Sequence, residues 1–347
     1  MRSILLFLTI ATLVFSSCKK DEKQETSVTP PAPFAFKVPE GWPAPSYNFE
    51  DNKVTRSGFE LGRHLFYDTQ LSKDNSISCG SCHQPFVAFA HAGHVVSHGV
   101  NGLVGTRNSP GIYNLAWHTS FMWHGGVNHL EMQPLAPIAN PVEMDENINN
   151  IITKLQSDIK YPGMFKKAFG DEQVTSERIL KSFAQFMGMM VSANSKYDKY
   201  VRGEQGGEMT TAELNGLNIF RQKCGSCHTE PLFSDFTFRN NGLPVDPVVD
   251  DRGREVITGL AEDRYKFKVP SLRNVAYTAP YMHDGRFQTL EQSLDHYISG
   301  IAQTDNLDPL LQNGISLSAA EKQEVILFLK TLSDVDFISD QRFKEVH

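Results

Sequence analysis

The chain has 347 residues, of which 40% are hydrophobic and 21% charged, a composition typical of a globular protein of about two domains. Its formal charge of −7 is modest and no basic stripe runs through the sequence, which argues against a nucleic-acid-binding protein. A negative protein favours partners with a positive docking patch, but net charge identifies none of them.

The first segment has the composition of a targeting signal. Arg2 precedes an apolar run over residues 4–15, which is too short to span a bilayer as a mature helix. Small residues then lead to Cys18, so residues 1–18 are predicted to be a signal peptide. The Ser-Ser-Cys ending resembles a lipoprotein box in which Cys18 carries the lipid, although Phe15 stands where such boxes usually have leucine. An ordinary signal peptide with an incidental cysteine is the alternative.

Residues 19–45 are predicted to be a disordered tether, because residues 19–33 are charged and rich in proline and threonine. With the signal peptide, this segment predicts a protein of the cell envelope. The mature chain is expected in the periplasm or attached to a membrane through an N-terminal lipid.

Helical segments and two copies of one short motif follow in order. A predicted helix over residues 57–66 leads to Cys79-Gly80-Ser81-Cys82-His83, and a second helix is predicted over residues 172–191. After a linker at residues 203–207, a helix over residues 213–220 leads to Cys224-Gly225-Ser226-Cys227-His228, and an amphipathic helix is predicted over residues 318–332. This is a repeat on the scale of a whole domain.

Both motifs have the form C-x-x-C-H. An exported protein would be expected to oxidise free cysteine pairs to disulfides, but here each pair is followed at once by a histidine. The spacing lets two thiols bind the vinyl groups of a haem while the histidine ligates the iron from the same side. A thioredoxin-like redox pair or a four-cysteine zinc site would not need the histidines. The motifs therefore predict two covalently bound haem c groups.

No segment alternates regularly enough to predict a substantial sheet. We expect a mainly α protein with two cytochrome c-like domains, residues 46–202 and 208–340, packed around a di-haem interface.

Three further segments carry a resemblance to a known family. They are Gly-Thr-Arg-Asn-Ser-Pro at residues 105–110, Asn-Pro-Val-Glu-Met at 140–144 and Pro-Tyr-Met-His-Asp-Gly at 280–285. With the two haem motifs, they closely resemble the bacterial di-haem cytochrome c peroxidases, which include the MauG-type enzymes that oxidise a partner protein. The resemblance implies that His83 ligates the haem that reacts with peroxide, and that His228 ligates the haem that relays electrons.

The resemblance also implies how the far side of each iron is occupied. Peroxidases of the family have a removable histidine ligand eight residues before the asparagine of the Arg-Asn pair, a position held here by Val100. MauG-type members also lack that ligand. His91, His94 and His98 lie in the same loop, and any of them could ligate the iron if the loop were re-registered. The alternative is that they are exposed loop residues.

On the second haem, the family places methionine or, in MauG-type enzymes, tyrosine seventeen residues after Pro280, which is Tyr297 here. A phenolate favours ferric and higher oxidation states, whereas a thioether favours ferrous iron. Met282 and the neighbouring His296 are alternative ligands, and Tyr297 as a packing aromatic is the structural alternative.

Catalytic roles follow from the resemblance in the same way. Glu143 corresponds to the residue that moves a proton during peroxide cleavage, with Gln133 beside it, and burial would raise the pKa of the carboxyl. Glu131 is expected on a helix surface and not in the site. Trp123 corresponds to the tryptophan between the haems, although a tryptophan between domains is often only core. Next to it, His124 and Gly126 replace the usual aspartate and arginine.

The resemblance further implies one calcium ion, held by the Asn108 side chain and by the carbonyls of Thr278 and Pro280 together with water. The expected activity is reduction of hydrogen peroxide to water, with electrons from a small redox protein such as a cytochrome c or a cupredoxin. A MauG-type oxidase that modifies a protein or a small molecule is the first alternative. A non-enzymatic di-haem electron carrier is a distant one. Many relatives pair, so a homodimer is possible.

Overall fold

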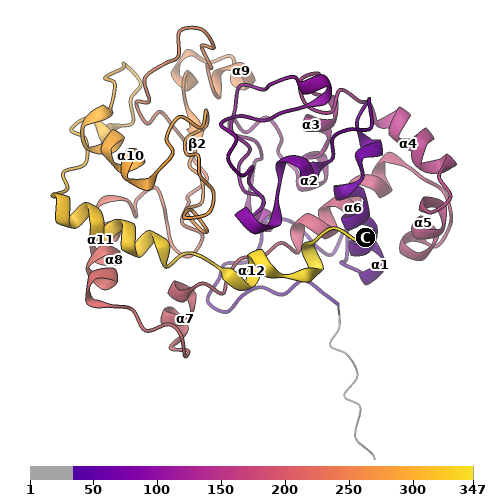
Figure 1. Ribbon diagram of the computed structural model, residues 1–347, viewed down its shortest axis with the longest axis horizontal. Coiled ribbons are helices and arrows are strands. Elements are labelled where there is room, and N and C mark those ends of the chain that lie inside the picture. Colours follow the sequence, from indigo (N-terminus) through magenta and orange to yellow (C-terminus); the bar gives the residue numbers. More distant parts are fainter. Residues whose placement is uncertain (1–33, 347) are drawn as a thin grey trace, which may run out of the picture. The chain divides into compact units, whose positions relative to one another are not determined.

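Short helices joined by long irregular segments make up most of the protein (Figure 1). The computed structural model describes residues 34–346. The predicted signal peptide, Cys18 and the first part of the predicted tether lie outside the described residues. No helix in the described part of the chain is long and apolar enough to cross a bilayer.

The helices that precede the linker include the first haem motif. They are α1 (Arg56–Tyr67), α2 (Cys79–Cys82), α3 (Leu135–Ala139), α4 (Ile148–Ser157), α5 (Tyr161–Phe169), α6 (Ser176–Gly188) and α7 (Lys196–Arg202). The prediction of helices over residues 57–66 and 172–191 is confirmed by α1 and α6, which pack side by side (Figure 1). Gly62 lies at their crossing, where a Cβ atom would meet the Ser182 carbonyl oxygen, so the helices approach this closely only because the position is glycine.

The helices after the linker repeat that arrangement. They are α8 (Thr211–Lys223), α9 (Glu255–Thr258), α10 (Leu290–Asp295), α11 (Ala319–Lys330) and α12 (Val335–Ser339). The helices predicted before the second motif and near the end of the chain are confirmed by α8 and α11, which pack on each other (Figure 1). Gly216 at their crossing faces the Glu324 carbonyl oxygen, as Gly62 faces Ser182.

The β structure of the described residues is a single antiparallel pair of two-residue strands. β1 (Phe238–Arg239) pairs with β2 (Phe267–Lys268), with Phe238 opposite Lys268. The expectation that no substantial sheet forms, and the mainly α fold class, are therefore confirmed for residues 34–346.

Buried apolar side chains gather in two main clusters. The first is built from α1, α4, α5, α6 and the segments around the first motif, and the second from α8, α11 and the segments around the second motif. The chain ends in the first cluster, because Phe337 of α12 and Phe343 pack there beside Phe59 and Phe89. The C-terminus accordingly lies next to α1 and α6 (Figure 1).

The predicted tether proves too long at its C-terminal end. Phe36 stacks on Phe49 with ring centroids 4.0 Å apart, and Trp42 packs edge-on against Trp117 at 4.9 Å. These aromatic side chains bury enough apolar surface to order the backbone between prolines. The expectation of disorder is therefore wrong for residues 34–45.

Candidate functional site

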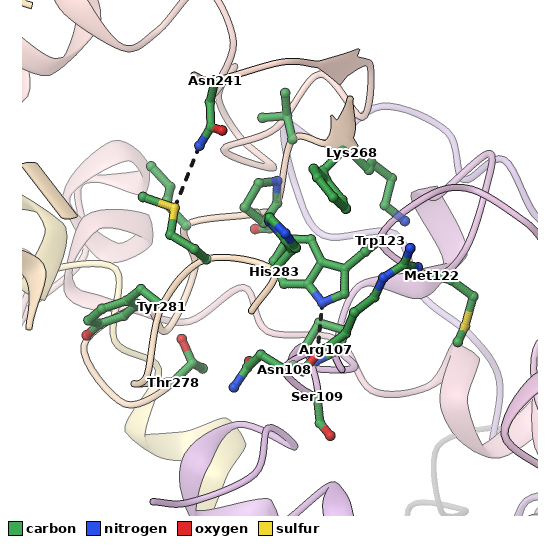
Figure 2. A pocket seen from close by; sticks show the side chains of 18 of the residues that line it. Arg107, Asn108, Ser109, Met122, Trp123, Asn241, Lys268, Thr278, Tyr281 and His283 are labelled. Atoms are coloured by element: carbon green, nitrogen blue, oxygen red, sulfur yellow. Dashed lines mark hydrogen bonds between the residues drawn. The ribbon is translucent and has the colours of Figure 1, made fainter. Parts of the chain in front are cut away.

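One cavity of about 880 Å³ reaches both haem motifs. Its walls are mainly apolar and include most of the residues singled out from the sequence. Those are His83, Asn108, Trp123, Gln133, Glu143, Cys224, Cys227, His228, Thr278, Pro280, Met282 and Tyr297. Figure 2 shows side chains that line this cavity gathered around Trp123.

The first motif forms the one-turn helix α2 and the residue after it. Cys79 and Cys82 are half-buried free thiols, and burial raises the pKa of Cys79 to about 12. The His83 Nδ1 atom lies 2.7 Å from the Phe89 carbonyl oxygen. Donation of the Nδ1 proton to this carbonyl leaves the lone pair of Nε2 free to bind a metal, the arrangement by which metal-ligating histidines are usually oriented.

The second motif has the same local chemistry. Cys224 and Cys227 are free thiols directly after α8, and burial raises the pKa of Cys224 to about 12. His228 Nδ1 lies 3.1 Å from the carbonyl oxygens of Phe233 and Pro270. The second motif brings both thiols and its imidazole to the cavity wall, whereas the first brings only His83, with Cys79 and Cys82 directly before it in the chain and outside the lining. Two thiols and one imidazole oriented by a backbone carbonyl are the donor set that a haem c requires, so the residues of each motif fit one such group.

Two equivalent loops frame the cavity. In one, Phe121 pairs with Val127 and the chain reverses through Met122; in the other, Tyr281 pairs with Phe287 and the chain reverses through Met282. Both methionines have positive φ angles, +66° and +73°. The loop over residues 121–127, which contains Trp123, and the loop over residues 281–287 of the Pro-Tyr motif therefore share the same backbone conformation at these positions.

Trp123 lies at the junction of these loops. Its indole Nε1 donates to the Asn108 carbonyl oxygen at 2.8 Å, and its own carbonyl oxygen accepts from the Lys268 backbone N–H at 2.8 Å (Figure 2). The Asn108 backbone N–H in turn donates to the His283 carbonyl oxygen at 2.7 Å. Trp123 is therefore held by residues from both halves of the chain, its indole by Asn108 and its backbone by Lys268.

Glu143 faces the same cavity near the first motif, and burial raises the pKa of its carboxyl above the usual value of 4.5. Hydrogen bonds from Ser97 and Asn140 oppose that shift. Gln133 lines the cavity too, with its Nε2 atom 3.9 Å from the Met122 sulfur. A half-buried carboxyl in a cavity that is also lined by an amide side chain is suited to moving a proton and orienting the molecule that carries it.

Glu131 lies outside this arrangement. It sits in the helical turn Leu130–Met132 and accepts a hydrogen bond from the Tyr47 hydroxyl at 2.6 Å. It is not among the cavity-lining residues.

The loop that carries Val100 is held tightly against Glu143. Val100 is buried, and its backbone N–H donates to the Glu143 carbonyl oxygen at 2.8 Å. Gly99 lies so close to Val142 and Glu143 that a Cβ atom would clash with their backbone. Re-registration of this loop would break these contacts.

The three histidines of that loop form their own cluster. His91 stacks on His94 at 4.1 Å, and His94 Nδ1 lies 3.1 Å from His98 Nε2. None of the three lines the cavity. His91 is buried, with an Nδ1 atom that has no hydrogen-bond partner, so the description of all three as exposed loop residues does not hold for it.

Near the second motif, both candidate ligands approach one amide. Asn241 Nδ2 lies 3.4 Å from the Tyr297 hydroxyl oxygen and 3.7 Å from the Met282 sulfur (Figure 2). Burial raises the pKa of Tyr297. His296 contacts the backbone of the same residue, with its Nε2 atom 3.0 Å from the Asn241 carbonyl oxygen.

The residues predicted to bind calcium, Asn108, Thr278 and Pro280, line the cavity. The Asn108 amide nitrogen donates to the Val95 carbonyl oxygen at 3.0 Å, which leaves its side-chain oxygen free to accept a cation. Across residues 34–346, no cluster of three or more histidine, cysteine or acidic side chains is arranged to hold a metal ion. A site made of carbonyl oxygens would not depend on such a cluster.

Sequence reasoning missed three polar residues of this site, Lys268, His118 and Asn241, which all line the cavity. No local motif marks any of them. For His118 the copied loops were an available signal, because aligning Phe121 with Tyr281 would have drawn attention to the residues just before Phe121. Lys268 and Asn241 lie far from either loop along the chain, and no sequence signal points to them.

Comparison with known proteins places this architecture among haem enzymes. A family profile described as di-haem cytochrome c peroxidase matches residues 56–206. The chain is 32% identical to the methylamine utilization protein MauG of Methylorubrum extorquens, over 86% of this chain and 83% of that protein. It is 34% identical to the cytochrome c551 peroxidase of Nitrosomonas europaea, over 79% of each.

Among solved structures, a MauG-like protein associated with microbial copper homeostasis superposes with a TM-score of 0.82 at 33% identity, covering 90% of this chain and 99% of that one. The di-haem peroxidase BthA of Burkholderia thailandensis superposes with a TM-score of 0.70 at 21% identity, covering 85% of this chain and 91% of that one, which shows a shared fold.

Proposed function

Because this chain belongs to the di-haem cytochrome c peroxidase family, a family of oxidoreductases with c-type haem, we propose that it reduces hydrogen peroxide to water with electrons from a small redox protein. The observation that carries the proposal is the single cavity that joins His83, Glu143 and Trp123 to His228. We also propose two haem domains, residues 46–202 and 208–340, built mainly around the two buried clusters, with Tyr197 of the first range packed in the second cluster and Phe337 of the second range in the first.

Each haem motif would hold one haem c through its two thiols and its histidine. The bound irons would supply the redox chemistry, in which one peroxide takes up two electrons and two protons to give two waters. His83 would be the proximal ligand of the peroxide-reacting group and His228 that of the relay group. Both imidazoles are already oriented by backbone carbonyl oxygens.

Glu143 would move the proton. Its ionised carboxylate takes a proton from the oxygen of peroxide nearest the first site and returns it to the departing oxygen. Gln133 would orient the peroxide through its amide. The apolar walls exclude water from the reacting oxygens.

Trp123 would carry electrons between the two sites, because it lies at their junction, with its indole held by Asn108 and its backbone by Lys268. We propose Tyr297 as the distal ligand of the second group, with Met282 as the alternative, and a calcium ion held by Asn108, Thr278 and Pro280. The donor would be a cytochrome c or a cupredoxin of the envelope. The mature protein would be periplasmic or attached to a membrane through Cys18, and it could pair as a homodimer.

A MauG-type oxidase is the second candidate, favoured by one observation. Val100 stands where ordinary peroxidases have a removable ligand, and it is buried and bonded to Glu143. The first site would then be open to peroxide without prior reduction.

The deciding experiment uses the full chain purified from a haem-loading host. Steady oxidation of reduced cytochrome c on addition of hydrogen peroxide supports the peroxidase. A long-lived spectral change without prior reduction, in the absence of such turnover, supports the MauG-type oxidase. A haem-loaded protein that gives no spectral response to peroxide overturns both and leaves an electron carrier.

A further inference from the structure

Lys268 of β2 carries an ammonium group that is buried at the junction of the two motif sites. The residue is only 9% exposed. Its Nζ atom donates to the Ser120 carbonyl oxygen at 2.7 Å and lies 3.4 Å from His118 Nδ1. Burial lowers the pKa of His118 well below its usual value, so this imidazole is neutral and does not compensate the positive charge of the ammonium.

No described carboxylate compensates the charge of Lys268: burial is the one influence on its pKa, which it lowers to about 7. The neighbouring cations already have carboxylate partners, Arg107 in Asp251 and Arg254 in Asp263, whose oxygen lies 3.8 Å from Arg254 Nε. Lys268, Arg107 and Arg254 all act as cations on His124, whose pKa falls to about 4 mainly through burial. Asp251 is the acidic group among them, and it is bound by Arg107 through two contacts of 2.6 and 2.7 Å.

A buried cation is costly unless an anion pairs with it. Lys268 lines the cavity that we propose to hold the haems, and each haem c carries two propionate carboxylates. The cavity therefore contains an ammonium group without an anionic partner, and the haems would bring propionate carboxylates that need a cationic one.

We propose that Lys268 is the counter-charge for a haem propionate and that it holds that carboxylate at the junction beside Trp123. The inference rests on the proposed di-haem function. Lys268 is a positioning residue, because its backbone N–H bonds to Trp123 while its ammonium would fix the edge of the haem (Figure 2). One residue would thereby set the geometry between the indole and the haem.

The test compares Lys268→Met and Lys268→Arg with Lys266→Met in the full-length, haem-loaded protein. Lys266→Met is the control, because it removes the same charge from a position two residues away. The Lys266 Nζ atom lies 3.2 Å from an Asp263 carboxylate oxygen, and Lys266 does not line the cavity. The readouts are the midpoint potentials of both haems from spectroelectrochemical titration and the propionate vibrations in the resonance Raman spectrum.

Lys268→Met should lower the midpoint potential of one haem, because a nearby positive charge favours the reduced form, and should shift a propionate band. Lys268→Arg should stay near the wild type in potential. If Lys268→Met matches Lys266→Met in both readouts, the proposal is overturned.

The pH dependence of the wild type gives an independent check should Lys268→Met fail to fold. A lysine paired with a propionate stays protonated well above pH 7, so Lys268→Arg and the wild type should show the same potential between pH 6 and 8. An unpaired Lys268 would lose its proton near its pKa of about 7, and the potential of the wild type alone would fall as pH rises through that value. That fall would refute the pairing. A haem-loaded chain inert to peroxide would refute the proposed function and leave the Lys268 result standing.

Discussion

Replacing Glu143 by glutamine tests the proposed proton transfer most directly. The variant keeps the size of the side chain and its polar contacts but removes the group that exchanges a proton. We expect the rate of reaction with hydrogen peroxide to fall by about 10²- to 10⁴-fold, the usual contribution of a general acid–base group. Such a loss corresponds to about 3 to 5 kcal/mol of barrier height.

The structure indicates why this loss should come from proton transfer alone. Glu143 is hydrogen-bonded to Ser97 and Asn140, and a glutamine oxygen can still accept from those side chains. Its backbone N–H bonds to the Asn140 carbonyl oxygen at 3.0 Å and its carbonyl oxygen to Val100, and neither bond involves the side chain. Haem loading and the resting spectrum should therefore be unchanged.

The pH profile carries the same information with a definite sign. Burial raises the pKa of Glu143 above 4.5, and the ionised form is the one that accepts a proton from peroxide. The rate should rise with pH through that raised pKa and then level off, and Glu143→Gln should lack this limb. The folding stability should depend on pH in the opposite direction. The neutral carboxyl of Glu143 is favoured by burial, so its contribution to the free energy of unfolding is present at low pH and is lost as pH rises through the folded-state pKa.

Stopped-flow absorbance after mixing the haem-loaded protein with peroxide measures the rate, and Glu131→Gln is the matched control. Glu131 lies twelve residues earlier, accepts from Tyr47 and does not line the cavity, so its variant should react like the wild type. Equal rates for the two variants would refute the assignment of Glu143.

Three further outcomes are expected. Tyr297→Phe should change the ferric spectrum of the second haem while Met282→Leu leaves it unchanged; the reverse result would make Met282 the ligand. Trp123→Phe should slow the response of the second haem to peroxide while the first still reacts, as seen by stopped flow at wavelengths that separate the two; equal rates would contradict the relay. Arg273 is fully buried and bonds to Asp198 at 2.7 and 2.9 Å, so Arg273→Met should destabilise the fold by about 3–5 kcal/mol in urea unfolding, because it strands a buried carboxylate. The double variant with Asp198→Asn should recover part of that loss, and no recovery would show that the pair is not what the single variant breaks.

The sequence predicts what depends on neighbours along the chain. The C-x-x-C-H spacing is a local pattern and indicates haem c without any knowledge of the fold. The apolar periodicity of α1, α6, α8 and α11 is local too, and these helices were predicted correctly. The segment from residue 34 to 45 was misjudged for a related reason. Its prolines are a local sign of disorder, while the partners of Phe36 and Trp42 lie in other segments that no local pattern reveals.

The same distinction holds in the cavity. Glu143 and Trp123 are proposed as functional residues only because neighbouring residues match a known family, and a lone glutamate or tryptophan would have indicated nothing. Lys268 has no such motif, and its exposed-looking sequence context (Tyr-Lys-Phe-Lys) predicts a surface lysine. Its burial follows from contacts with Ser120 and Trp123, which are far from it along the chain.

The two copied loops would let one fold hold two sites with the different tasks that we propose. Their backbones match through Met122 and Met282, so the loop that frames the cavity has the same backbone form on both sides. The next residues differ: Trp123 in one loop corresponds to His283 in the other, and burial lowers the pKa of His283 to about 4. Both meet at Asn108, the first through its indole N–H and the second through its carbonyl oxygen. A neutral imidazole on one side and an oxidisable indole on the other would make the path between the sites asymmetric, although the scaffold that holds them is repeated.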